Sequence, residues 1–323
     1  MKNMKKTAKV SLVFTLVLVI MLISISGIFA TEAKPPKAIT LLCGVSGGTW
    51  FSIGSIVSEV FRKAGIRSSV EIGGGVSNVI AIDRQDAELG MTMTITPPVA
   101  KKGGVPFKEK HEDVMGVGTL FKNFAHIMVS EASGINSIDQ LKGRKFASQP
   151  VGTSTQQAFT DILSIYGLSE DDLKITRGGQ SEGAALVKDR HVVGLTATTA
   201  APSATLSEIA LSISMKILPI SDEKYEELAK INNGYVKTSL PAGTYAGQDE
   251  DVPGVRVDTI LIVNKNMSEE EVYWITKTLV ESIEELRVAH ASMKDLTVEE
   301  MSKVGGVELH PGAKKYYEEV LGK

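Results

Sequence analysis

Three segments of the chain repeat one local arrangement: an apolar strand-like run leads into a loop of glycines and small hydroxyl residues, and helical periodicity follows. These loops are Gly44–Trp50 (GVSGGTW), Gly73–Asn78 (GGGVSN) and Pro150–Thr155 (PVGTST). Glycine allows close backbone approach to a ligand, and a helix N-terminus presents unpaired N–H groups at the positive end of its dipole. Such ends bind carboxylates or phosphates without a cationic side chain. Turn and N-cap chemistry explains any one such loop, but three in one chain favour a small anionic ligand.

Strand-like runs and helical patterns alternate along the chain, and this alternation predicts an α/β fold with mainly parallel sheets. The runs that predict strands are Ala38–Cys43, Ser69–Ile72, Leu89–Thr94, Val114–Thr119, His126–Ser130, Lys145–Ser148, Val192–Ala197, Lys216–Ile220 and Val257–Val263. Helical patterns between them include Ser181–Lys188, Asp222–Ile231 and Glu269–His290. Roughly 290 residues follow the N-terminal segment, more than one hydrophobic core usually supports, so we expect two lobes.

Residues 1–30 are interpreted as an export segment, either a signal peptide or an uncleaved N-terminal anchor. Lysines at the start precede an uncharged stretch from Val10 to Ala30. Both alternatives place the remainder of the chain outside the cytoplasm, in the periplasm or on the outer face of the cytoplasmic membrane. Without residues 1–30 the formal net charge falls from −3 to −7, because four lysines and no acids are removed. An acidic domain of this kind is poorly suited to bind nucleic acid.

Residue types that carry catalysis show no recognisable grouping in the sequence. The five histidines are scattered without metal-ligand spacing, and Cys43 lies within a predicted strand. No nucleophile elbow accompanies a partner histidine, and the glycines at 73–75 are not followed by the Lys-Ser/Thr pair of a nucleotide-binding loop. We therefore expect no enzymatic activity, no metal and no cofactor. A single cysteine also excludes an internal disulfide.

The segment Leu240–Asp249 (LPAGTYAGQD) has no periodicity of its own. Together with Asp251–Pro253 it resembles a signature of the TAXI-type solute receptors of tripartite ATP-independent periplasmic (TRAP) transporters. Other segments resemble those of the same family, in the same order along the chain. They are GVSGGTWFSIG at 44–54, GGGVSNVIAIDRQDAELG at 73–90, SGINSIDQLKGRKFASQPVGTST at 133–155 and LHPGAKKYYEE at 309–319. The resemblance extends over residues 38–320.

This resemblance implies a two-lobe periplasmic-binding-protein fold of type II, with an interdomain ligand cleft that closes over a small organic acid. One lobe would comprise residues 37–127 and 242–323, and the other residues 128–241. Loops 44–50 and 73–78 would then face loop 150–155 across the cleft. The residue pattern agrees, because all three loops follow strands and ligands of open α/β sheets bind beyond the carboxyl ends of the strands.

The predicted ligand-binding residues are small and polar residues of the three loops, hydroxyls that follow a third strand, and Gln180. They are Ser46, Gly47, Gly48, Thr49, Trp50, Gly75, Ser77, Asn78, Thr94, Thr96, Gly152, Thr153, Ser154, Thr155 and Gln180. Some have structural alternatives, since Thr153 with Gln156 fits a capping box and Trp50 lies on the core-facing stripe of its helix. Tyr245 is expected to pack between the lobes or to form the lip of the cleft. Arg177, just past a strand, is an alternative partner for the anion.

The sequence departs from the family pattern at two places that concern the ligand. Trp50 and Phe51 stand in place of paired aromatics with phenolic hydroxyls, and Thr92, Thr94 and Thr96 stand where relatives often carry Gln or Asp. A wall with hydroxyls only is poorly suited to neutralise an ammonium group. The sequence therefore favours a C4 or C5 dicarboxylate without an amine, such as 2-oxoglutarate or succinate, over glutamate.

Two functions remain open at this point. In the first, a monomeric extracytoplasmic receptor captures a small organic anion and delivers it to a TRAP membrane permease of the fused type, which uses an ion gradient. In the second, the closed form reports the ligand to a sensor kinase. Both require the same fold and cleft, and a neighbouring permease gene or sensor-kinase gene would discriminate between them.

Overall fold

A mixed sheet of ten strands runs through the described part of the molecule. The computed structural model describes residues 34–44 and 49–322. The strand order is β2-β1-β3-β10-β4-β7-β5-β6, with β8 beside β4 and β9 beside β10. The strands are β1 (Ala38–Leu42), β2 (Arg67–Glu71), β3 (Leu89–Met93), β4 (Val114–Ser130), β5 (Lys145–Ser148), β6 (Lys174–Arg177), β7 (Gly194–Thr199), β8 (Met215–Ile217), β9 (Val236–Leu240) and β10 (Val252–Asn264).

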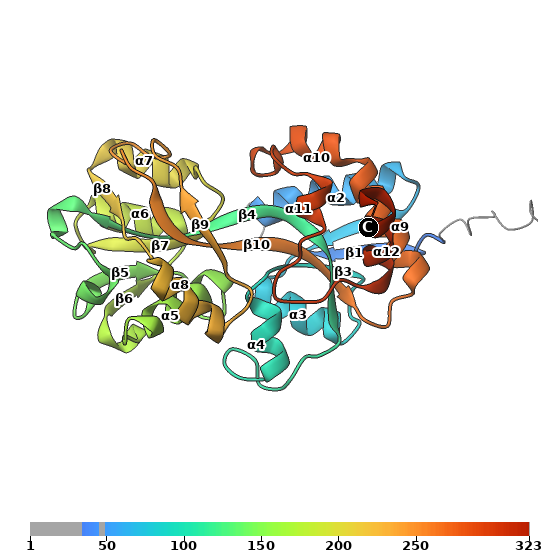
Figure 1. Ribbon diagram of the computed structural model, residues 1–323, viewed down its shortest axis with the longest axis horizontal. Coiled ribbons are helices and arrows are strands. Elements are labelled where there is room, and N and C mark those ends of the chain that lie inside the picture. Colours follow the sequence, from blue (N-terminus) through green and yellow to red (C-terminus); the bar gives the residue numbers. More distant parts are fainter. Residues whose placement is uncertain (1–33, 45–48, 323) are drawn as a thin grey trace, which may run out of the picture. The chain divides into compact units, whose positions relative to one another are not determined.

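Helices connect the strands and flank the sheet (Figure 1). They are α2 (Thr49–Lys63), α3 (Gly75–Asp83), α4 (Thr96–Lys102), α5 (Ser154–Ile165), α6 (Gln180–Lys188), α7 (Ala204–Ser212), α8 (Asp222–Ile231), α9 (Glu269–Glu281), α10 (Ile283–Ala289), α11 (Val298–Met301) and α12 (Pro311–Leu321). None of these helices is long and apolar enough to cross a membrane. The apolar stretch Val10–Ala30 lies outside the described residues.

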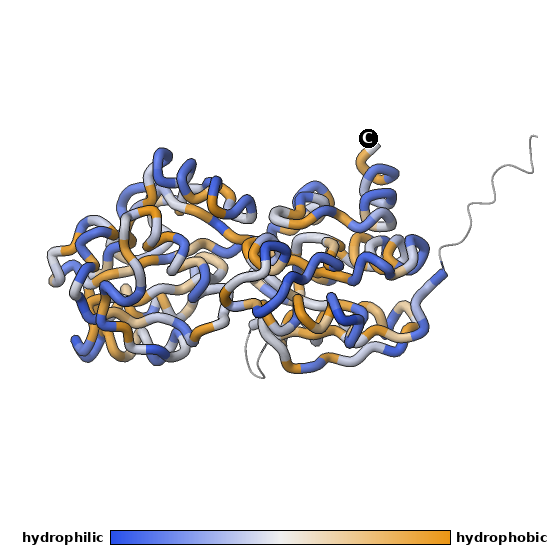
Figure 2. The backbone as a smooth tube through the Cα atoms, turned by 90° about the horizontal axis from the view of Figure 1, so that it is seen from below, coloured by the Kyte–Doolittle hydropathy of each residue, from blue (hydrophilic) through white to orange (hydrophobic). Residues whose placement is uncertain are grey.

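Helix α2 shows how the apolar pattern becomes a packed helix. Ile53, Val57 and Phe61 lie on one stripe at helical spacing, and all three are fully buried. They pack against Leu41 and Leu89 of the neighbouring strands in one hydrophobic cluster. Figure 2 shows the alternation of apolar and polar residues along such segments. The helix predicted after the first loop is therefore confirmed.

Strands β4 and β10 pass through both parts of the sheet (Figure 1). Residues 114–124 of β4 pair with β10, and residues 124–129 pair with β7. The sequence predicted two separate strands here, which is wrong, because the polar residues Lys122 and Asn123 interrupt the apolar run without ending the strand. Lys122 forms an ion pair with Glu300 (Nζ–Oε2 2.8 Å), and the buried Asn123 amide donates to Val257 O (3.2 Å).

The centre of the sheet is antiparallel, whereas its flanks are parallel. β1 runs parallel to β2 and β3, and β5 runs parallel to β6 and β7. β10 and β4 are antiparallel to each other. β10 also pairs antiparallel with β3, and β4 pairs antiparallel with β7. The prediction of mainly parallel sheets is therefore confirmed for the flanks only. In the centre, the two long strands β4 and β10 run in opposite directions.

Separate hydrophobic clusters form the cores of the two lobes. One cluster joins α2, β1, α9 and α12 in the first lobe, and another joins Phe146, Phe159 and their neighbours in the second. Met93 and Ile95, which end β3 and precede α4, pack into the second cluster, and Trp50 packs against both. The residue limits of the lobes at 127/128 and 241/242 stay a prediction.

The long helix predicted over Glu269–His290 is interrupted at one residue. α9 ends at Glu281 and α10 begins at Ile283, because Ser282 has a ψ of 12° in place of a helical value. Ser268 caps α9 by accepting a hydrogen bond from Glu271 N, and Glu271 completes the capping box. The predicted start of the helix at Glu269 is thus confirmed, whereas the prediction of one continuous helix to His290 is wrong.

Candidate ligand-binding site

A cavity of about 600 Å³ lies where the crossing strands meet the N-terminal ends of α2, α5, α6 and α7. Residues of both lobes line it. Its polar lining is Thr49, Asn123, Gln149, Thr155, Gln180, Thr198, Thr199, Ser203, Thr205, His290 and Ser292. Its apolar and small lining is Gly44, Trp50, Met93, Phe121, Ala200, Pro202, Ala204 and Ala291.

Four helix N-termini contribute first-turn residues to this cavity. Thr49 and Trp50 begin α2, Gln180 begins α6, Ala204 and Thr205 begin α7, and Thr155 is the second residue of α5. The first N–H groups of a helix have no partner inside the helix, and the dipole makes that end electropositive. The cavity therefore offers backbone donors and partial positive charge to an anion from several directions.

Charged side chains are absent from the described lining of the cavity, which contains no Lys, Arg, Asp or Glu. Arg177, the alternative anion partner, lies outside it. Its guanidinium pairs with Glu170 (Nη2–Oε2 2.8 Å) and donates to Gln149 O (3.1 Å). A carboxylate already neutralises Arg177, so the helix ends are the stronger candidates for holding an anion.

Thr198 carries a hydroxyl that lacks a partner in the described part of the protein. The residue is only 8% exposed, it lines the cavity, and its Oγ1 is buried without a hydrogen bond. A buried hydroxyl without a partner costs roughly 1–3 kcal/mol of folding free energy. A ligand oxygen in the cavity would supply the missing partner.

Two residues that line the cavity, Trp50 and Asn123, are held by one threonine of β10. Trp50 Nε1 and Asn123 Nδ2 both donate to Thr259 Oγ1, at 3.2 and 2.9 Å. Because the Asn123 amide nitrogen also donates to the carbonyl of Val257, the amide orientation is determined, and its Oδ1 accepts no hydrogen bond from the described residues. The cavity thus contains an acceptor as well as donors.

Of the residues predicted from the sequence, Thr49, Trp50, Thr155 and Gln180 line the cavity. Ser46, Gly47 and Gly48 lie outside the described residues. The remaining predicted residues lie outside the lining. They are Gly75, Ser77, Asn78, Thr94, Thr96, Gly152, Thr153 and Ser154. Their role as ligand residues stays a prediction.

For several of these residues, contacts within the protein explain the residue type in structural terms. The Asn78 amide donates to the carbonyls of Cys43 and Met91, both at 2.8 Å, and so joins α3 to β1 and β3. Thr94 Oγ1 donates to Gly234 O at 2.6 Å, and Thr153 Oγ1 accepts from Gln156 N at 3.2 Å as the N-cap of α5.

Loops 73–78 and 150–155 lie in contact at Gly75 and Ser154, which do not line the cavity, whereas the sequence predicted that the two loops face each other across the ligand cleft. A Cβ atom on Gly75 would lie 2.3 Å from Ser154 Oγ, so a larger residue here would require the Ser154 side chain to move. Ser154 Oγ is also 3.0 Å from Thr96 Oγ1, which links the start of α5 to the start of α4. These contacts join the starts of α3 and α4 to the start of α5.

Asn123, Thr198 and Ser203 are lining residues that the sequence did not identify. A signal existed for Thr198 and Thr199, which follow the predicted strand Val192–Ala197 at the carboxyl end where ligands bind in α/β sheets. Asn123 offered no such signal, since it lies between two apolar runs that were predicted as separate strands. Ser203 is recognisable as an N-cap only once α7 is known.

Comparisons with known proteins agree with this architecture. The NMT1-like family matches residues 41–320 of the chain. A Xanthomonas citri protein bound to ATP has a TM-score of 0.51 at 12% identity, over 89% of this chain and 96% of that one. A Bordetella bronchiseptica protein also scores 0.51 at 14% identity, over 89% and 81%. The periplasmic aliphatic sulphonate binding protein SsuA from Escherichia coli scores 0.47 at 16% identity, over 88% and 79%. The two-lobe periplasmic-binding-protein fold predicted from the sequence is confirmed.

Proposed function

The chain belongs to the NMT1-like family, and from this premise we propose that it is an extracytoplasmic solute-binding receptor for a small organic acid. The observation that carries the proposal is the cavity between the lobes. Four helix N-termini contribute residues to it, its described lining has no charged side chain, and the buried Thr198 hydroxyl has no hydrogen-bond partner among the described residues. An anion of modest size satisfies all three conditions.

The cavity walls suggest how the acid is oriented. Carboxylate oxygens lie against the first turns of α5, α6 and α7, where the first N–H groups have no acceptor within the helix. Trp50, Met93 and Phe121 form the apolar wall against which an aliphatic body packs. About 600 Å³ is sufficient for a C4 or C5 acid with some water.

The candidate ligands are succinate, 2-oxoglutarate and glutamate, and of these only glutamate carries an amine. Thr92, Thr94 and Thr96, the hydroxyl residues that disfavour an amine, bond to Gly75 O, Gly234 O and Ser154 Oγ. These residues do not line the cavity, whereas Asn123, with its free acceptor, does. We therefore include glutamate, and a hydrogen-bond donor on the ligand is favoured over a ligand with acceptors only.

Delivery to a membrane permease is the second part of the proposal. The resemblance to TAXI-type receptors supports a TRAP permease of the fused type as the partner, and the basic and apolar residues 1–30 support export. In this scheme the lobes comprise residues 37–127 with 242–323 and residues 128–241, and closure over the ligand creates the surface that the permease binds.

A thermal-shift series on residues 31–323 tests the binding function. Succinate, 2-oxoglutarate and glutamate are added separately, with 1,4-butanediol as an uncharged control. Because a ligand that binds only the native state raises the apparent stability, at least one acid should raise Tm and the diol should not. Calorimetry then gives Kd. No shift with any of these acids, or an equal shift with the diol, would contradict a site for organic anions.

A further inference from the structure

The signature segment Leu240–Asp249 folds as a loop held by its own hydrogen bonds. Gly243 and Gly247 have positive φ values of 76° and 78°, which favour glycine. Gln248 Nε2 lies within 3.2 Å of the carbonyls of Leu240 and Pro241, and Gly243 N donates to Gln248 O at 2.7 Å. The glycines and the glutamine therefore close the loop, and the tyrosine between them is held in place.

Tyr245 extends from this loop into the interior, where it is 4% exposed. Its hydroxyl lies 3.0 Å from His126 Nε2 and accepts a hydrogen bond from Ser203 N at 3.1 Å. His126 is fully buried, and its Nδ1 lies 3.2 Å from Ala197 O. A carbonyl can only accept, so Nδ1 carries the proton, Nε2 accepts from the Tyr245 hydroxyl, and that hydroxyl retains a lone pair for Ser203 N–H.

Burial keeps each member of this network neutral. Loss of hydration lowers the pKa of His126 to about 4 and raises the pKa of Tyr245 to about 12. Neither group titrates near neutral pH, so the direction of the hydrogen bonds is constant there. The network is a fixed support.

The hydrogen-bond network of His126, Tyr245 and Ser203 extends to the cavity. Ser203 is the N-cap of α7, and it lines the cavity together with the next two residues, Ala204 and Thr205. Ser203 Oγ accepts from Gln180 Nε2 at 2.7 Å, and Gln180 is the first residue of α6. Crossing strand β4, the signature loop and two helix N-termini are therefore joined by one chain of hydrogen bonds.

We propose that Tyr245 is a positioning residue of the binding site, which fixes the N-termini of α7 and α6 against the ligand. This inference rests on the proposed function of the cavity as an anion site. Tyr245 does not need to touch the ligand. Its hydroxyl orients Ser203, and Ser203 orients the donors that do.

Tyr245→Phe removes the hydroxyl and keeps the ring. Tyr235→Phe is the matched control, because Tyr235 is also buried (3% exposed) and its hydroxyl donates to Asp161 Oδ2 at 2.8 Å, away from the cavity. Calorimetry with the acid that stabilises the wild type should show a roughly tenfold higher Kd for Tyr245→Phe. Tyr235→Phe should stay within about twofold.

Two readouts report on the network itself. Hydrogen exchange of the Ser203 amide should accelerate in Tyr245→Phe and not in Tyr235→Phe, with or without ligand. In the wild type, ¹⁵N NMR should show His126 protonated at Nδ1, and the acid should shift the Nε2 resonance through Ser203 and Tyr245. Tyr245→Phe should abolish that shift.

The outcomes separate this inference from the proposed function. Equal Kd values and equal Ser203 exchange in the two variants would overturn the positioning role. If no acid binds the wild type but Ser203 exchange accelerates in Tyr245→Phe, the support of α7 stands and the proposed anion function fails.

Discussion

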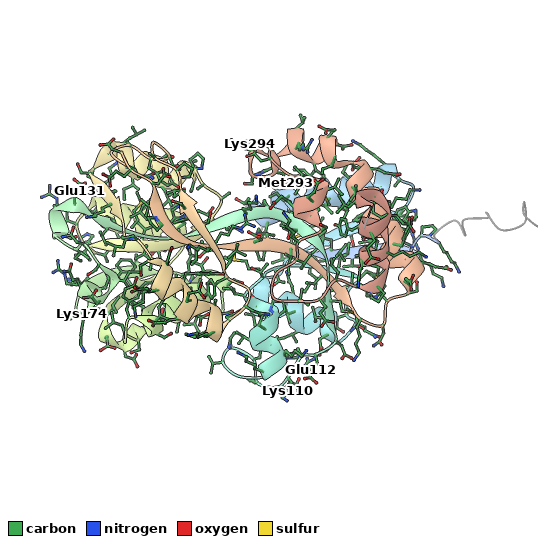
Figure 3. All side chains as sticks on the ribbon, viewed as in Figure 1. Lys110, Glu112, Glu131, Lys174, Met293 and Lys294 are labelled. Atoms are coloured by element: carbon green, nitrogen blue, oxygen red, sulfur yellow. The ribbon has the colours of Figure 1, made fainter. Side chains whose placement is uncertain are left out.

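Two cavities of the molecule differ in how they could attract an anion. The larger, about 1120 Å³, lies beside α4 and α8 and carries Lys101, Lys102, Lys110, Lys230 and Lys265 in its wall. Figure 3 shows Lys110 beside α4, near Glu112. The smaller, about 600 Å³, lies between the lobes and has no charged side chain in its described lining. Side-chain charge alone would select the larger cavity.

Most lysines of the larger cavity already interact with the protein itself, so their number overstates the attraction for an anion. Lys101 and Lys102 end α4, and Lys230 lies in the last turn of α8, where cations offset the negative end of the helix dipole. Lys102 Nζ donates to Ile231 O at 3.0 Å, and Lys265 pairs with Asp113 at 2.6 Å. The last residues of α4 and α8 line the larger cavity, together with Pro97 and Pro98 from the first turn of α4, whereas first-turn residues of four helices line the smaller one. The number of helix starts is therefore the better guide to anion binding.

A negative charge placed at an N-terminus of the smaller cavity should have the largest effect. Thr205→Asp puts a carboxylate in the first turn of α7, where it favours the helix itself but repels a bound acid. We expect Kd to rise at least about 100-fold, or about 2.8 kcal/mol, by calorimetry. Unfolding by denaturant should show unchanged or higher stability. Normal affinity in this variant would remove α7 from the site.

Removal of the Thr198 hydroxyl should have an intermediate effect: it should weaken binding without lowering the stability of the free protein. Thr198→Val should raise Kd about tenfold, while the stability of the free protein stays equal or rises, because the variant removes a buried hydroxyl that has no partner in the described part of the chain. Thr196→Val on the same strand is the control. Thr196 Oγ1 donates to His126 O at 3.2 Å, so this variant should lose about 1 kcal/mol of stability without a change in Kd. The reverse pattern would show that the Thr198 hydroxyl does not meet the ligand.

Salt should change the affinity only slightly. Electrostatic attraction inside a partly enclosed cavity is screened less than attraction to exposed lysines, so Kd should rise less than about threefold between about 0.05 and 0.5 M NaCl. Calorimetry across this range checks it, with sodium fluoride as a second salt against competition by chloride. A steep dependence in both salts would point to the exposed lysines.

The smallest effects are expected for the basic residues. Lys101→Gln, Lys230→Gln and Arg177→Ala should leave Kd within about twofold, since none of the three lines the smaller cavity and exposed charges contribute little at a distance. If Arg177→Ala abolishes binding while Thr205→Asp and Thr198→Val bind normally, a guanidinium holds the acid and the comparison of helix ends fails.

The sequence predicted elements with strong local signals. β5 and α8 have the predicted limits, Lys145–Ser148 and Asp222–Ile231, because an apolar run or an amphipathic pattern with a serine N-cap is a local property. β6 and β9 were missed. β6 is an edge strand whose side chains are mostly exposed, and β9 alternates over only five residues, so neither shows an apolar run.

The candidate site divides in the same way. Thr153 caps α5 as predicted, and Thr49, Trp50, Thr155 and Gln180 begin helices at the cavity, because glycine, hydroxyl and periodicity signals act within a few residues of one another. The sequence by itself thus determined that helices begin after small polar loops and that the chain forms an α/β fold with two lobes.

Tertiary structure alone decided which polar groups reach the cavity. Thr259 accepts hydrogen bonds from Trp50 and Asn123, each more than 130 positions away in the sequence. Tyr245 and His126, which are hydrogen-bonded, are 119 positions apart. The register of β4 against β10 sets the pair Asn123–Thr259, and the packing of α2 and of segment Leu240–Asp249 against these strands sets the other two. No local pattern encodes either. A hydroxyl such as that of Thr94 or Thr198 binds whichever donor or acceptor the crossing strands bring to it. For this reason the residue types of the site can be predicted from the sequence, but their partners cannot.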